Sequence, residues 1–166
     1  MKTLIRTLLL LSLVVWLGAE IFFPVVAAVT FTTLKPDTHV AGLIVGELLR
    51  LLHVAGMVAG VVLLALLALA PAWGIFKPRS VLVPMGLVVV MLALTAYSQF
   101  GIIPAMERDR LSARGGDINS LALEDPARVH FDVLHKRSLN VEGSIVLLGI
   151  AVVALVAYGE SAARRV

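Results

Sequence analysis

Residues 41–70 have the sequence AGLIVGELLRLLHVAGMVAGVVLLALLALA, a long apolar run that ends at Pro71. A helix of about 20 mainly apolar residues is long enough to cross the roughly 30 Å hydrocarbon core of a bilayer. Three further segments meet this criterion: residues 4–30, residues 81–103, which stop at Pro104, and residues 126–158. The sequence therefore predicts an all-α membrane four-helix bundle that forms a single domain over residues 1–166.

The composition also indicates a protein embedded in the lipid bilayer. Of the 166 residues, 60% are hydrophobic and 15% are charged, whereas soluble domains are about half apolar and about a quarter charged. The formal net charge is +3, but the basic residues do not cluster into a surface that would bind nucleic acid. The chain has no cysteine, which excludes disulfides, thiolate metal sites, iron–sulfur clusters and cysteine nucleophiles.

The charges at the ends of the spans predict an orientation. One side of the membrane would hold both termini and the connection between the second and third spans. The charged residues on that side are mostly basic: Lys2, Arg6, Lys77, Arg79, Arg164 and Arg165, against Glu160 alone. Because cytoplasmic segments carry the excess of Lys and Arg, both termini are expected in the cytoplasm. Residues 31–40 and a polar loop at residues 105–125 would then face outward.

Several local signals mark the ends of the helices. Asp125 followed by Pro126 predicts the start of the fourth span. The sequence from Arg114 to Asp117 contains two glycines and predicts a turn. Lys2 and Arg6 before a leucine run resemble a signal peptide, but the apolar stretch is too long for one. We therefore expect the first span to be retained.

The two halves of the chain resemble each other weakly. EIFFP at residues 20–24 resembles FGIIP at residues 100–104, and LLH at residues 51–53 resembles VLH at residues 133–135. Both offsets are close to half the chain, which favours a tandem duplication of a helical hairpin about an axis along the membrane normal. The alternative is chance agreement between leucine-rich segments. A duplication would make His53 and His135 equivalent residues that approach each other across the axis.

Polar side chains within the spans are the main functional signal. A charge near the bilayer centre costs about 2.5–3.5 kcal/mol on insertion scales, so such groups usually face the bundle interior and find partners. In the predicted topology these groups all lie in the outward half of their helices: Glu20, Glu47, Arg50, His53, Tyr97, Gln99, His135, Asn140 and Glu142. Ser138 shares a helix face with His135 and Glu142. These residues predict a ligand-binding site, and the alternative is a hydrogen-bond network that only fixes helix register.

The second span also carries small residues at helical spacing. Gly42 and Gly46, and again Gly56 and Gly60, form two small-xxx-small pairs, which permit close helix approach in membranes. These faces are candidate contacts of a homo-oligomer. On the same helix, Glu47 and Arg50 are also spaced to form a simple ion pair near the membrane surface.

Three stretches together resemble a known family. They are WLGAEIFFPVVAAVTF at residues 16–31, AGLIVGELLRLLH at residues 41–53 and DPARVHFDVLHKRSLNVEG at residues 125–143. This combination looks like the bacterial branch of the family related to transmembrane protein 205, a four-span group that carries a domain of unknown function. The most specific element is Phe131-x-x-Leu134-His135-x-x-Ser138, and Glu142 departs from the small polar residues usual there. The resemblance implies the architecture and a bacterial inner membrane, and it implies no mechanism.

Three classes of function fit these observations. The first is binding of a small ligand, cation or metal ion in the outward half of the bundle, associated with transport. The second is binding of haem b with His53 and His135 as axial ligands, as in membrane oxidoreductases such as the HemJ-type protoporphyrinogen oxidases, which are similar in size and span number. The third is a structural subunit whose loop at residues 105–125 docks a partner. No nucleophile–base pair or known metal-ligand spacing favours hydrolytic catalysis.

Overall fold

Each predicted span is a helix in the computed structural model, which describes residues 2–164. The first two spans are α1 (Lys2–Thr33) and α2 (Thr38–Leu69). The third combines α3 (Leu82–Tyr97), the π-helical turn η2 (Ser98–Ile102) and α4 (Ile103–Ser112), and the fourth is α5 (Pro126–Arg164). All four spans are long and apolar enough to cross a membrane. The structure thus confirms an all-α four-helix membrane bundle, although Arg165, used above for the orientation, lies outside the described residues.

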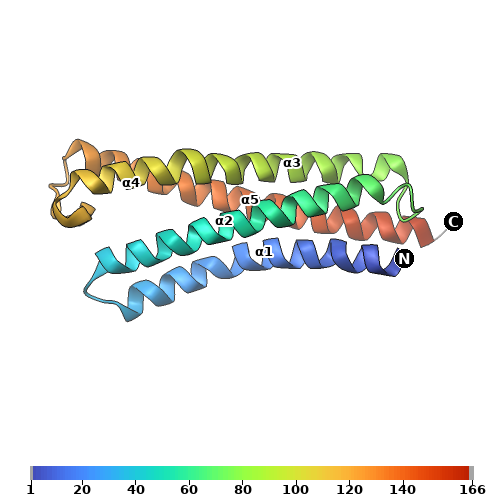
Figure 1. The fold of residues 1–166 in the computed structure, drawn as a ribbon, viewed down its shortest axis with the longest axis horizontal. Coiled ribbons are helices and arrows are strands. Elements are labelled where there is room, and N and C mark those ends of the chain that lie inside the picture. Colours follow the sequence, from blue (N-terminus) through green and yellow to red (C-terminus); the bar gives the residue numbers. More distant parts are fainter. Residues whose placement is uncertain (1, 165–166) are drawn as a thin grey trace.

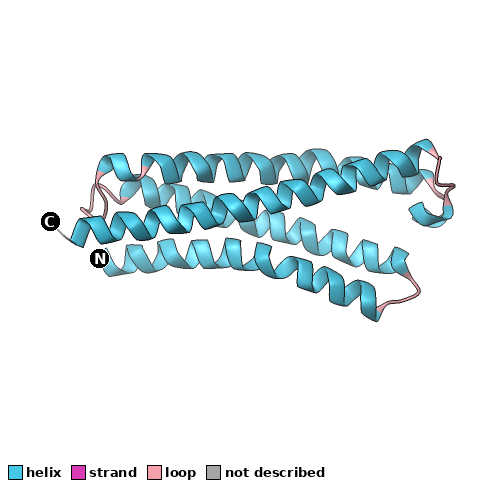
Figure 2. Cartoon of the chain, turned by 180° about the vertical axis from the view of Figure 1, so that it is seen from behind, coloured by secondary structure: helices cyan, strands magenta, loops and turns pink. Residues whose placement is uncertain are grey.

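The two ends of the chain lie at the same end of the bundle (Figure 1). Contacts between α1 and α2 and between α3 and α5 hold the helices together, whereas α1 contacts α5 much less. Figure 2 shows the reason: α1 and α5 lie close together near the chain termini and diverge toward the opposite end.

The third span does not end at Pro104, and this prediction was wrong. Proline lacks the N–H that an α-helix needs at this position. In the structure, η2 precedes Pro104, and the backbone N–H of Ile103 bonds to the carbonyl of Ser98, five residues earlier. This wider turn lets the helix continue to Ser112. The predicted polar loop at residues 105–125 is therefore helical in its first part, and the connection begins at Ala113.

The predicted local signals in the polar connection are present. Gly115 and Gly116 have φ angles of 65° and 75°, which glycine adopts at little cost. The carboxylate of Asp125 accepts a hydrogen bond from the backbone N–H of Ala127 at 2.9 Å, at the start of α5. The expected turn and the expected helix start are thus confirmed.

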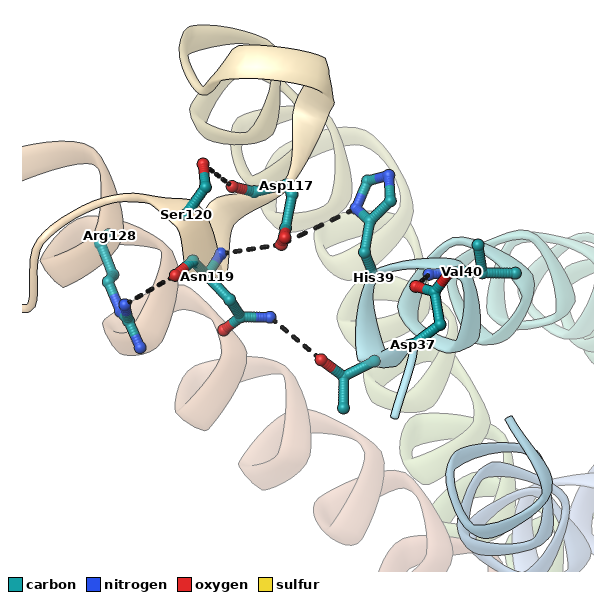
Figure 3. A network of polar contacts seen from close by, with 8 residues as sticks. Asp37, His39, Val40, Asp117, Asn119, Ser120 and Arg128 are labelled. Atoms are coloured by element: carbon teal, nitrogen blue, oxygen red, sulfur yellow. Dashed lines mark hydrogen bonds and ion pairs between the residues drawn. The ribbon is translucent and has the colours of Figure 1, made fainter. Parts of the chain in front are cut away.

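The connection between α4 and α5 closes one end of the bundle through polar contacts (Figure 3). Asn119 donates a hydrogen bond to the hydroxyl of Thr38 at 3.4 Å, and Asp117 lies 4.0 Å from His39. The guanidinium of Arg128 donates to the carbonyls of Asn119 and Leu121. These contacts join the start of α2 to the start of α5.

The glycine pairs of α2 accept side chains from the same chain. The indole of Trp16, which is 1% exposed, lies against both Gly56 and Gly60. At the outer pair, a Cβ atom on Gly42 would lie 2.9 Å from the guanidinium of Arg110. The glycines of α2 therefore contact side chains of the same chain, and their role in a homo-oligomer stays a prediction.

Replacing Gly60 by alanine is expected to destabilise the bundle, because the added methyl group would overlap the Trp16 indole and Leu92. Overpacking a well-filled core costs about 1–3 kcal/mol, more than the roughly 1 kcal/mol that alanine adds in helix propensity. Gly86→Ala is the matched control, because a Cβ atom there meets nothing within 4 Å. Thermal unfolding in detergent should show a lower Tm for Gly60→Ala only. A Tm equal to that of Gly86→Ala would contradict this packing.

Candidate functional site

A polar cluster lies inside the bundle around His53, whose side chain is fully buried. The ring nitrogen Nε2 lies 2.9 Å from Oε1 of Glu142 on α5, and Nδ1 lies 3.1 Å from Oε1 of Gln99 in η2. Ser98 donates its hydroxyl proton to the same Glu142 oxygen at 3.0 Å. Because both partners of the ring are oxygen acceptors, a proton on each ring nitrogen satisfies both bonds. The cluster is therefore suited to an imidazolium–carboxylate pair.

Glu20 brings a second carboxyl group to this cluster from α1. Its side chain is 3% exposed and lies within electrostatic reach of Glu142 and His53. The Oε1 atom of Glu20, Oε2 of Glu142 and Nε1 of Trp16 are buried and make no hydrogen bond of good geometry, although the Glu20 carboxyl group lies near both Trp16 and Glu142. Buried polar atoms without partners are uncommon, so each needs a physical explanation.

The helical pattern explains why these polar groups face inward. On α1, Glu20 continues the buried series of Leu9, Leu13 and Trp16. On α2, His53 occupies the same face as the buried Gly56 and Gly60. Glu20 and His53 thus lie on the helix faces that pack into the core.

The π-helical turn η2 supplies two neighbouring residues to the cluster. In a regular α-helix, consecutive side chains point about 100° apart and do not face one neighbour together. Accordingly, Ser98 bonds to Glu142 on α5, whereas Gln99 bonds to His53 on α2. Ser98 was absent from the sequence-based site, although its helical spacing from the buried Met91 and Thr95 could have placed it on the inner face of the span.

A groove of about 710 Å³ adjoins the cluster between α1 and α5. Its walls are mainly apolar and include Ile21 and Pro24 from α1 and Leu147 from α5. Polar groups in the lining are Glu20, Asn140 and Ser144. A second hollow of about 340 Å³ continues along the same interface toward the chain termini, lined from Leu10 to Ile21 by apolar residues. Glu20 therefore connects the buried cluster to an apolar groove.

The structure brings together four of the residues proposed from the sequence, namely Glu20, His53, Gln99 and Glu142. Ser138 is also buried, and Asn140 lines the groove. These residues come from every span.

Other proposed residues lie apart from this cluster. Glu47 is exposed and pairs with Arg50 at 3.3 Å, and Arg50 also lies 3.8 Å from Glu107 on α4. This arrangement matches the alternative of a simple ion pair. Tyr97 is exposed, and its hydroxyl accepts a hydrogen bond from Arg137 at 3.3 Å.

His53 and His135 are not equivalent, and the expectation that they pair was wrong. The ring of His135 is exposed and stacks on Phe131 with the centroids 6.4 Å apart. In α5 it is the preceding residue, Leu134, that is buried. Both ring nitrogens of His53 already have partners, so this residue does not present a free ligand atom. The two histidines therefore do not fit axial ligation of haem b or a shared metal ion.

The described residues contain no group of three or more His, Cys, Asp or Glu side chains arranged to hold a metal ion. The buried His53–Glu142 pair, with Glu20 beside it, instead forms a set of hydrogen-bonding and proton-holding groups. The carboxyl oxygens of such a set can accept hydrogen bonds and carry negative charge.

Comparison with known families places much of the chain in one of them. The model of a family described as Domain of unknown function (DUF4149) matches residues 11–113. This region contains Glu20, His53, Ser98 and Gln99, and it ends before α5 and Glu142. No curated protein and no solved structure matches the chain.

Proposed function

We propose a function from the site itself, because this chain belongs to the DUF4149 family, whose domain has no known function. In this proposal the integral membrane protein binds a small amphiphile with a positively charged amine in the groove between α1 and α5. Glu20 holds the amine, and binding serves transport of the amphiphile. The observation that carries the proposal is a buried carboxyl group, that of Glu20, which lines an apolar groove and has no cation paired with it among the described residues.

The carboxyl group of Glu20 in the groove lining favours a positively charged ligand. A buried carboxylate that is not paired with a cation is unfavourable, because it has lost its hydration without a compensating charge. An alkylammonium group supplies N–H donors and a positive charge, and both interact strongly with a carboxylate where water is scarce. A carboxylate or phosphate ligand would instead meet Glu20 and Glu142 as like charges.

The apolar part of the ligand follows from the groove walls. Ile21 borders both hollows, so an alkyl chain beside Glu20 can extend along α1 past Leu17 and Leu13. Burial of each methylene group stabilises binding by about 0.8 kcal/mol. The groove thus favours a ligand with one charged end and one apolar end.

The membrane location forms part of the same proposal. The excess of basic residues at the chain termini supports cytoplasmic termini, and the resemblance to relatives of transmembrane protein 205 supports a bacterial inner membrane. Because the groove lies between two membrane spans, an amphiphile would enter it laterally from the bilayer.

Binding of radiolabelled n-octylamine to the purified protein in lipid nanodiscs tests the proposal. Glu20→Gln should weaken binding at least about tenfold, which corresponds to about 1.4 kcal/mol. Glu47→Gln is the matched control, because its carboxyl group is exposed on α2, and it should bind as the wild type does. Octanol and octanoate should compete poorly. Equal binding by wild type and Glu20→Gln, or equal competition by octanol, would overturn the proposal.

A further inference from the structure

We infer that the groove exchanges one proton, held on Glu20, for each alkylammonium ion that it binds. This inference rests on the proposed function and names how that site is regulated. Two observations support it. Three neighbouring buried atoms, Oε1 of Glu20, Oε2 of Glu142 and Nε1 of Trp16, make no hydrogen bond of good geometry, and the cluster holds two carboxyl groups but only one histidine.

Three ionisable side chains meet at the cluster, and each comes from a different helix. They are Glu20 from α1, His53 from α2 and Glu142 from α5, while η2 contributes the uncharged Ser98 and Gln99. With His53 protonated, the 2.9 Å contact between His53 and Glu142 unites a positive ring and a negative carboxylate into a neutral pair. Glu20 has no cation of its own in the cluster.

A second negative charge beside Glu142 is unfavourable in the bundle interior. Two carboxylates that share a site with little water do not both ionise readily, because each repels the other and both lose hydration. A proton on Glu20 leaves the whole cluster neutral, which is the arrangement that a membrane interior tolerates best.

One proton on Glu20 also accounts for all three unpartnered atoms. A protonated carboxyl group has one O–H donor and still accepts at its other oxygen. Its O–H can donate to Oε2 of Glu142, and its other oxygen can accept from Nε1–H of Trp16. Trp16 lies one helical turn before Glu20 on the same buried face of α1, so its indole and the Glu20 carboxyl group are neighbours. An ionised Glu20 would present only acceptors to Glu142.

The exchange balances both atoms and charge. When an alkylammonium ion enters the groove, the O–H bond of Glu20 breaks and the proton passes to the buffer. The carboxylate that remains accepts hydrogen bonds from the ammonium group. Cluster and ligand together are again neutral, so the ion replaces the proton without leaving a net charge in the membrane.

Proton release during octylamine binding tests this inference. Wild-type protein in weakly buffered nanodiscs, with a pH-indicator dye in the solution, should release about one proton per amine bound near neutral pH. In separate binding measurements, affinity should fall by up to about tenfold per pH unit as the pH is lowered, because protons then compete for Glu20. The amine itself remains charged throughout this range.

Controls separate this inference from the proposed function. Glu47→Gln should release protons as the wild type does, and Glu20→Asp, which keeps a carboxyl group, should retain release at lower affinity. Binding without proton release and with affinity independent of pH would overturn the exchange and leave the proposed function intact. Absence of amine binding at every pH would overturn both.

Discussion

Replacing His53 by alanine is expected to lower the free energy of unfolding by about 3–5 kcal/mol, the cost of removing one partner from a buried ion pair. The substitution would leave Glu142 with only Ser98 as a donor and would leave Gln99 without a partner. Thermal or denaturant unfolding in detergent measures the loss.

Two further variants make this prediction specific. His135→Ala removes an exposed histidine that stacks on Phe131, so its effect should stay below about 0.5 kcal/mol. The double substitution of His53 and Glu142 by leucine removes both charges, and it should recover much of the stability that His53→Ala loses. Equal effects of His53→Ala and His135→Ala would show that the buried pair does not stabilise the bundle.

Replacing Trp16 by alanine is expected to cost a similar 3–5 kcal/mol, because it removes the largest fully buried side chain of the bundle. The indole lies against Gly56 and Gly60 of α2, and both positions lack a side chain that could fill the space. The α1–α2 contact, which is the most extensive between two helices, would lose its centre. The Tm should fall sharply in detergent.

A substitution on the lipid-facing side of the same helix provides the control. Phe22 is 61% exposed on α1, so Phe22→Ala should change the Tm little. Trp16→Phe should lose less stability than Trp16→Ala, since a ring still occupies part of the space. A Tm for Trp16→Ala close to that of Phe22→Ala would contradict the central position of the indole.

The candidate site could be predicted from the sequence only in part. Glu20 and His53 stood out because ionisable residues in apolar spans are costly wherever they lie. The same reasoning included Glu47 and His135, which proved to be exposed. Hydropathy shows which polar residues are unfavourable within a membrane span, but it does not give the rotation of each helix about its axis. In α5 the residue on the inner face is Leu134, whereas His135, one position later, is exposed.

The apolar runs by themselves determined the four helices, because an unpaired backbone in lipid leaves a long hydrophobic segment no alternative to the helix. The start of α5 was equally local, since Asp125 and Pro126 act on the adjacent backbone. Only the tertiary structure decided the partners of His53 and Ser98 and the groove beside Glu20. These features depend on the rotation of each helix about its axis and on the divergence of α1 from α5, which contacts between distant segments determine.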